Sequence, residues 1–256
     1  MKDNLNQTEV DIIMPNYNSA PYVSETIDSV INQEFKNWTL IIIDGNSNLE
    51  TRKILENYDK HPKINIIQLK KNKKAGFCRN FAMRISKSEY VAFLDSDDIW
   101  DKKKLSKQLE FMIKNKYYFT YTNYLPFKSD HKQSELKEIK PDKYFTFETF
   151  IKNTSIGTST MLIKKSSIGI TKFSNTKICE DYFFKCQILK KVGNAHCLAE
   201  NLTKYRIRKN SLQSSKIRNI YWIWYINKNY NRLNFLDNLL SILCISFNSV
   251  KKYGFK

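Results

Sequence analysis

The acidic tetrad DSDD at residues 95–98 follows directly on the apolar run YVAFL at residues 90–94. Side chains alternate along a strand, so we expect Asp95 and Asp97 to lie on the same side where this strand ends. Two carboxylates held close together repel each other unless a cation neutralises them, and all-oxygen ligands favour Mg²⁺ or Mn²⁺ over zinc or copper. The tetrad therefore predicts a divalent metal site. The alternative is a polar turn that caps a helix beginning near Asp101.

Glycine-rich phosphate-binding loops are not available to this chain. Its six glycines stand at positions 45, 76, 157, 169, 193 and 254, from which neither GxGxxG nor a P-loop can be assembled. Mg²⁺ held by one or two carboxylates usually completes its shell with water and substrate phosphates. A metal on the tetrad is therefore the natural means of holding a nucleotide here.

Apolar strand-like runs alternate with helix-like segments through the first half of the chain, and these elements must position the tetrad. We expect four strands at residues 10–14, 40–43, 64–69 and 90–95, and four helices at residues 23–31, 49–57, 76–85 and 102–115. This alternation is typical of parallel βαβ units and a Rossmann-like, doubly wound α/β fold. Ligands in such folds bind beyond the carboxyl ends of the strands, where Asp44 and the tetrad stand.

The order is looser in the second half of the chain. We expect strands at residues 119–123 and 158–163, an extended segment at 202–207, a helix at 180–191 and a charged surface excursion at 128–143. The composition then becomes aromatic and basic. We therefore divide the chain into a domain over residues 1–214 and a helical tail over residues 215–256.

The bulk properties favour an acidic or phosphorylated partner. The chain has 256 residues, 41% of them hydrophobic, and a formal net charge of +18. Such a charge favours nucleic acid, an anionic membrane surface or phosphorylated substrates, although abundant Lys, Asn and Ile offer a purely compositional explanation. The chain starts with polar residues and has no apolar stretch of roughly 20 residues, which favours a cytoplasmic protein. Its five cysteines lack CxxC spacing, which favours reduced thiols.

Five short motifs stand in an order that resembles the family 2 glycosyltransferases, which are inverting GT-A enzymes that use nucleotide-sugars. They are DIIMPNYN, IIIDGNS, NKKAGFCRN, SEYVAFLDSDD and ED, at residues 11–18, 41–47, 72–80, 88–98 and 180–181. The segment YRIRKNS at residues 205–211 resembles one found in many bacterial envelope-polysaccharide enzymes of this family. The resemblance runs from residue 10 to residue 214 and implies a GT-A fold, which is a Rossmann-like doubly wound mixed sheet.

The resemblance also implies roles for individual residues. Asp97 would bind Mn²⁺ or Mg²⁺ together with Asp95, and Asp181 would be the base that deprotonates the acceptor. Nucleotide-sugar binding would involve Pro15, Tyr17, Asn18, Asp44, Arg79, Asp95 and Ser96. The acceptor side would comprise Thr158, Ser159 and Glu180.

Several of these residues have simpler explanations that the sequence leaves open. Tyr17 can pack into the core instead of stacking on a base, and Asp44 can cap a helix. Arg79 can pair with an acid on a helix face instead of balancing phosphate charge. Acidic residues such as Glu180 and Asp181 are favoured in the first turn of any helix.

Three positions depart from the family pattern. Gly45 stands where a second aspartate is frequent, Leu49 where another acid often follows, and Lys74 where glycine is usual. Donor identity is therefore open, although Asp44 is retained. The Q-x-x-R-W element of processive synthases is absent, which favours single addition over polymerisation.

The tail over residues 215–256 is basic, aromatic and amphipathic. It has seven Lys or Arg residues against one acid, and its leucines and Phe247 fall at helical spacing. This combination predicts a helix lying in an anionic membrane interface. The alternative is a helical pair that packs on the catalytic domain or on a second copy of the chain, as in a homodimer.

Together these observations predict a metal-dependent inverting glycosyltransferase, peripheral at the cytoplasmic face of the plasma membrane. It would move a sugar from a nucleotide-sugar, with UDP-sugars favoured, to a hydroxyl of an envelope saccharide or lipid-linked acceptor. The alternatives are a basic nucleic-acid-binding protein and a catalytically silent scaffold. No helix-turn-helix, zinc or RNP motif is recognisable, so we expect no nucleic-acid partner.

Overall fold

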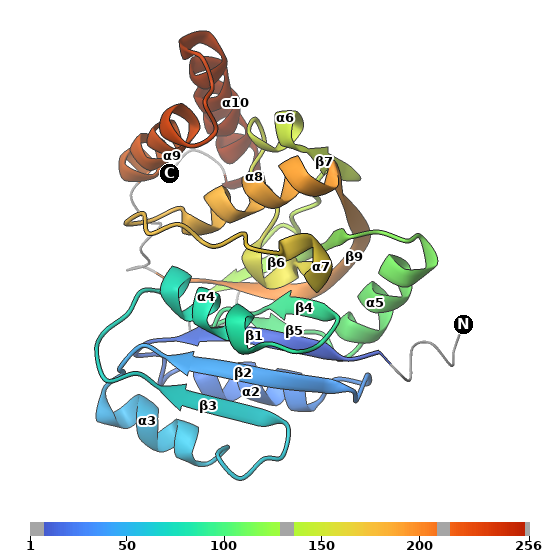
Figure 1. Cartoon of the computed structure of the whole chain (residues 1–256), viewed down its shortest axis with the longest axis vertical. Helices are drawn as coiled ribbons and strands as arrows, with labels where there is room; N and C mark the ends of the chain where they lie inside the picture. The colour runs from blue at the N-terminus through green and yellow to red at the C-terminus, as the bar shows by residue number, and fades with distance from the viewer. Residues whose placement is uncertain (1–7, 129–135, 209–215, 254–256) are drawn as a thin grey trace.

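The computed structural model describes residues 8–128, 136–208 and 216–253. They form one central sheet with helices packed around it (Figure 1). The strands are β1 (Val10–Asn16), β2 (Trp38–Asp44), β3 (Ile64–Gln68), β4 (Tyr90–Phe93), β5 (Ile99–Trp100), β6 (Phe119–Lys128), β7 (Tyr144–Thr146), β8 (Leu162–Lys164) and β9 (Asn194–Ile207). The helices are α2 (Val23–Ile31), α3 (Leu49–Glu56), α4 (Ala75–Ile85), α5 (Lys104–Lys114), α6 (Phe147–Phe150), η1 (Thr158–Thr160), α7 (Lys165–Ile168), α8 (Glu180–Val192), α9 (Lys216–Asn229) and α10 (Phe235–Tyr253).

The first four strands pair in parallel and carry Asp44 and the tetrad beyond their carboxyl ends. The strands pair in the order β3-β2-β1-β4-β8-β6-β9-β5, and β7 joins β9. Every residue of β1 is buried, as expected for a parallel strand covered on both faces. Alternate residues of β1 enter two different cores, with Ile13 on one face and Ile12 and Met14 on the other.

Helices cover both faces of this sheet, which confirms the doubly wound arrangement. One core holds Val23 and Ile27 of α2 together with Leu105 of α5. The opposite core holds Ala82 of α4 and Phe184 of α8. The strand β8 runs antiparallel to both β4 and β6, so the sheet is mixed, as predicted.

The tetrad lies in a turn and not at the end of an extended strand. β4 ends at Phe93, and a hydrogen bond from the Asp98 N–H to the Asp95 carbonyl oxygen (3.1 Å) closes the turn that follows. Strand alternation is therefore the wrong reason for the closeness of the two predicted metal ligands. The turn itself brings them together before β5 begins.

Two other segments differ from the sequence-based expectation. The segment predicted as a strand over residues 158–163 begins as the 3₁₀ turn η1, because the Thr160 N–H donates to the Gly157 carbonyl oxygen (3.1 Å). Residues 129–135 of the predicted surface excursion lie outside the described residues. Beyond them, Ile139 is buried and pairs with Tyr124, so this end of the excursion belongs to the fold.

The tail packs against the rest of the protein, and α9 and α10 form one end of the molecule next to α8 (Figure 1). Three isoleucines of these helices are buried in the same core as α8 and the sheet, namely Ile223, Ile226 and Ile245. Tyr182 of α8 donates to Asn227 (2.6 Å), and Ser241 donates to the carbonyl oxygen of Ile151 (2.6 Å). Among the described residues, no helix combines the length and the apolarity that crossing a bilayer requires.

The outward side of α10 is apolar, whereas part of its inward side is polar. Asn238 and Ser241 are buried, while Leu236 and Phe247 are 74% and 72% exposed. Besides Phe235 at its start, this helix exposes five apolar residues, which we call the α10 stripe: Leu236, Leu239, Leu240, Leu243 and Phe247. Amphipathic helices normally turn their apolar side to the core. The described residues therefore leave the stripe uncovered.

Truncating Ile226 measures how firmly α9 belongs to the folded core. Ile226→Ala should lower the free energy of unfolding by about 2–5 kcal/mol, because Ile226 is fully buried and its loss leaves a cavity. The matched control is Ile217→Ala on the same helix, where the side chain is 83% exposed and the expected change is below about 0.5 kcal/mol. Urea unfolding measures both values. Equal stabilities would show that α9 does not contribute to the core.

Candidate active site

Hydrogen bonds join the carboxyl ends of β1 and β2 into one edge. The carboxylate of Asp44 accepts from Asn16 Nδ2 (2.7 Å) and from the Ser47 backbone N–H (3.0 Å). Ser47 Oγ in turn accepts from the Asn18 N–H (2.9 Å), and Asn18 has a left-handed φ of 48°. Asp44 is fully buried, so its carboxylate shapes this turn from inside. Its predicted contact with a nucleotide stays a prediction.

Other residues of this edge bear on the alternatives that the sequence left open for Tyr17 and Asp44. Tyr17 is 46% exposed, so its ring is not packed into the core, whereas Pro15 is buried within β1. Asn48, and not Asp44, caps α3, because its side chain accepts from the Thr51 N–H (3.0 Å). The edge therefore offers one accessible aromatic ring on a rigid, hydrogen-bonded frame.

The structure explains why glycine occupies position 45. A Cβ on Gly45 would lie 2.7 Å from the carbonyl oxygen of Lys73 and 3.3 Å from that of Asn16. Any side chain would therefore push the loop between β3 and α4 away from the end of β2. The aspartate that is frequent in the family does not fit beside this loop.

Asp98 is the most buried residue of the tetrad. Its carboxylate accepts from the Ser159 hydroxyl (2.5 Å) and from the Arg206 backbone N–H (2.9 Å). Burial, together with the neighbouring aspartates, raises the pKa of Asp98 well above its usual value. Arg206 also donates through Nε to the Asp97 carbonyl oxygen (2.7 Å). Arg206 thus holds the turn, a role that its place in the YRIRKNS segment does not reveal.

Asp95 and Asp97 are the accessible carboxylates, with side chains 29% and 13% exposed, and Ser96 lies partly buried between them. Burial raises the pKa of Asp97 to about 6, with Asp95 adding to the shift and Arg208, 2.7 Å away, opposing it. A divalent cation relieves the repulsion between the carboxylates of Asp95 and Asp97, and carboxylate oxygens suit Mg²⁺ and Mn²⁺. Within the described residues, no group of three or more His, Cys, Asp or Glu could enclose a metal ion. The two carboxylates therefore fit a metal that also needs water and substrate phosphate as ligands.

Arg79 of α4 joins the tetrad to the predicted base segment. Its guanidinium donates to Asp95 Oδ1 (2.6 Å) and Glu180 Oε1 (3.0 Å), and it lies over the ring of Phe173 (5.2 Å). Burial opposes its charge, but the two acids outweigh burial and raise the pKa of Arg79 above its usual value. The pairing with acids that the sequence left open is the arrangement found. Arg79 is buried with a contact at each terminal nitrogen, so it bridges two segments, and its predicted role toward the nucleotide-sugar stays a prediction.

The 3₁₀ turn η1 connects the same two segments from another side. Ser159 Oγ accepts from the Asp95 N–H (3.0 Å) and donates to Asp98. Thr158 Oγ1 donates to Asp181 Oδ2 (3.1 Å). Both hydroxyls were expected on the acceptor side. Ser159 is buried and braces the tetrad through these two hydrogen bonds, whereas Thr158 lies against the predicted base; their place on the acceptor side stays a prediction.

Asp181 lies in the first turn of α8 with its side chain 19% exposed. Lys185, one helical turn further on, places Nζ 2.8 Å from Asp181 Oδ2. Burial disfavours the charged form, but Lys185, Arg79 and Thr158 outweigh it and lower the pKa of Asp181 to about 2. Asp181 is therefore ionised at neutral pH. Sequence reasoning missed Lys185, whose only signal is a lysine four residues after an acid on a helix.

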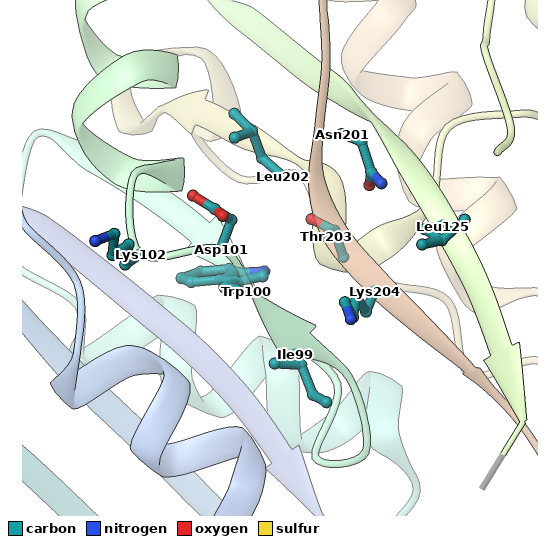
Figure 2. Close-up of a pocket in the computed structure, with 9 residues that line it drawn as sticks. All are labelled: Ile99, Trp100, Asp101, Lys102, Leu125, Asn201, Leu202, Thr203 and Lys204. Atoms are coloured by element: carbon teal, nitrogen blue, oxygen red, sulfur yellow. The ribbon is translucent and has the colours of Figure 1, made fainter. Parts of the chain in front are cut away.

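A separate hollow of about 460 Å³ lies among β5, β6 and β9 (Figure 2). Its lining includes Trp100, Leu125 and Lys204, and none of the predicted site residues. Trp100 connects this hollow to the site, because its indole N–H donates to the Ser159 carbonyl oxygen (2.8 Å). The hollow therefore adjoins the residues that brace the tetrad without containing the predicted chemistry.

Comparison with known proteins identifies the class to which this fold and site belong. Residues 11–169 match the family described as Glycosyl transferase family 2. Over 244 residues the chain is 34% identical to the "Putative teichuronic acid biosynthesis glycosyltransferase TuaG" of Bacillus subtilis, covering 95% of this chain and 96% of that protein. Over 251 residues it is 32% identical to the "UDP-Glc:alpha-D-GlcNAc-diphosphoundecaprenol beta-1,3-glucosyltransferase WfgD" of Escherichia coli, covering 96% and 95%. The crystal structure of S. aureus TarS 1-349 in complex with UDP-GlcNAc shares the fold, with a TM-score of 0.73 at 19% identity over 95% of this chain and 73% of that one.

These similarities define an enzyme with a GT-A fold that transfers glycosyl groups. The chain belongs to glycosyl transferase family 2. The predicted family, fold and enzyme class are confirmed. The nucleic-acid-binding and scaffold alternatives have no comparable support.

Proposed function

We propose that the protein is a metal-dependent inverting glycosyltransferase that adds one sugar from a UDP-sugar to a hydroxyl of a lipid-linked saccharide. The observation that carries this proposal is the buried link from Asp95 through Arg79 to Glu180, beside Asp181. It holds the accessible carboxylates of the tetrad and the base carboxylate in one site. Direct transfer needs such a site, because donor and acceptor must meet at one sugar carbon.

The donor side of the proposed site comprises Asp95, Asp97 and the exposed ring of Tyr17. The two carboxylates would hold Mn²⁺ or Mg²⁺, which would supply positive charge beside the donor's diphosphate. Tyr17 offers a face on which a nucleotide base can stack. The name of WfgD, which specifies UDP-Glc, supports a UDP-sugar as the donor of this chain too.

The acceptor side centres on Asp181, whose carboxylate is ionised and partly accessible. In the proposed step it accepts the proton of the acceptor hydroxyl while that oxygen bonds to the anomeric carbon. The bond from this carbon to the diphosphate oxygen breaks, and the electron pair leaves with UDP. Attack opposite the leaving group inverts the configuration of the sugar, and Asp181 then releases the proton to solvent.

We place the enzyme peripherally at the cytoplasmic face of the plasma membrane, where a lipid-linked acceptor would be presented. WfgD is named for a diphosphoundecaprenol-linked acceptor. The α10 stripe is an apolar surface that the described residues leave uncovered, on a tail that carries seven basic residues and one acid. This pairing of apolar and basic groups suits an anionic membrane interface. A homodimer through the stripe is the competing arrangement.

The metal proposal is tested by thermal shift with a panel of nucleotides and nucleotide-sugars. UDP-glucose should raise the melting temperature only with Mn²⁺ or Mg²⁺, because binding to the native state stabilises it by mass action. In Asp97→Asn, adding Mn²⁺ or Mg²⁺ should no longer change the effect of UDP-glucose on the melting temperature. Asp59→Asn, at an exposed acid elsewhere, should behave like the parent protein. Donor binding of undiminished strength in EDTA would contradict the proposal.

The base proposal is tested by single-turnover transfer from UDP-glucose to a GlcNAc-diphospholipid. Asp181→Asn keeps the shape and removes the proton acceptor, so transfer should fall by roughly 10²–10⁴ while donor affinity survives. Glu180→Gln should cost less, because glutamine still offers Arg79 an oxygen at the 3.0 Å contact. If Glu180→Gln is the more damaging change, or Asp181→Asn transfers normally, Asp181 is not the base.

The membrane proposal is tested with vesicles that contain phosphatidylglycerol. Replacing Leu236, Leu243 and Phe247 together by Ser should release the protein from the vesicles, because apolar area leaves the interface. The melting temperature and donor affinity should be unchanged, since these side chains are exposed. Ile170→Ser, at an exposed residue outside the tail, is the control. If vesicle binding persists while a dimer dissociates in sedimentation, the stripe is a subunit interface instead.

A further inference from the structure

The two carboxylate oxygens of the proposed base have different surroundings. Oδ2 of Asp181 lies 2.8 Å from Lys185 Nζ and accepts the Thr158 hydroxyl at 3.1 Å. Lys185 Nζ also donates to Thr158 Oγ1 (3.2 Å), which closes a triangle of three contacts. In the part of the chain that the structure describes, no hydrogen bond ends on Oδ1. Among the described residues, the anchoring contacts of this carboxylate therefore all fall on Oδ2.

Lys185 is a cation almost without access to solvent, since 4% of its side chain is exposed. A buried lysine is costly unless it is paired and hydrogen-bonded, and among the described residues Lys185 donates to Asp181 and Thr158. Residues four apart share a helix face, so α8 itself presents the ammonium group to the carboxylate. A lysine that served only solubility would lie on the surface. Its burial at this point indicates a role tied to Asp181.

We propose that Lys185 is a positioning residue for the base: with Thr158 it fixes Oδ2 of Asp181 and leaves Oδ1 as the atom that receives the acceptor proton. This inference rests on the proposed function, in which Asp181 is the base. In the transfer step the acceptor O–H proton moves to Oδ1 while the oxygen bonds to the anomeric carbon. UDP leaves with the electron pair of the broken bond, and Lys185 keeps its own proton throughout.

The same contacts determine when the base is charged. The titratable groups that act on Asp181 or on its neighbours at the start of α8 are Lys185, Glu180, Cys179, Arg79 of α4 and Arg218 of α9. Burial by itself would raise the pKa of Asp181. The neighbouring groups together lower it to about 2, and Lys185 is the largest of these influences. Without Lys185 the pKa of Asp181 should rise. The ionised fraction of the base would then fall as the pH drops through the raised value.

Lys185→Met tests the inference, because methionine keeps much of the side-chain length and removes the charge. With UDP-glucose and a GlcNAc-diphospholipid as probes, we expect kcat to fall by about 10–10²-fold through loss of position. The KM for UDP-glucose should stay unchanged, and activity should be lost on the acid side of neutrality, where the parent enzyme remains active. Lys191→Met is the control, since Lys191 lies on the same helix but binds the Ile168 carbonyl oxygen (2.9 Å). It should change neither kcat nor the pH profile.

Thr158 provides a second, milder test of the positioning role of Lys185. It is needed if Lys185→Met does not fold, which would be recognised because UDP-glucose then fails to raise the melting temperature of that variant. Thr158→Val removes the hydroxyl with little change of shape and should lower kcat, and Thr158→Ser should restore it. Parental kcat and pH profile in the folded valine and methionine variants would overturn the inference while leaving Asp181 as the base. Normal transfer by Asp181→Asn would instead overturn the proposed function.

Discussion

The site depends most on one buried cation, the guanidinium of Arg79. It binds Asp95 at 2.6 Å and Glu180 at 3.0 Å, and removing it would leave two carboxylates without a partner in a largely desolvated place. The close approach of α4 and α8 that this requires depends on Gly76, where a Cβ would lie 2.9 Å from Glu180 Cγ. The glycine and arginine of the NKKAGFCRN segment therefore join the accessible acids of the tetrad to the segment of Asp181.

Local sequence pattern predicted the first four strands and their helices because each of these elements has a pattern of its own. Strands such as β1 are buried on both faces and read as continuous apolar runs, while the helices beside them are amphipathic. The tetrad was recognisable because it follows such a run at the carboxyl edge. The spacing of Leu236 and Phe247 likewise revealed an apolar stripe in the tail.

Contacts between distant segments could not be predicted in this way. Nothing local in Lys185 shows that it is buried against Asp181, and nothing in Arg79 selects two acids over a phosphate. The η1 turn was expected to be extended, and threonine does favour strands, but 3₁₀ hydrogen bonds form there instead. In α10 the spacing could not show which side faces the protein, since that depends on Ser241 donating to the Ile151 carbonyl oxygen.

An aspartate with a pKa of about 2 is a weak base, and this constrains the proposed reaction. It cannot deprotonate a sugar hydroxyl before attack, because the hydroxyl holds its proton far more tightly. Transfer becomes favourable only as the new carbon–oxygen bond withdraws charge from that oxygen. The proton must therefore move during the displacement, and the rate depends on Oδ1 of Asp181 being in place at that moment more than on its basicity. The buried contact with Lys185 favours position over base strength, which suits a single displacement in which proton transfer follows the formation of the new carbon–oxygen bond and does not precede it.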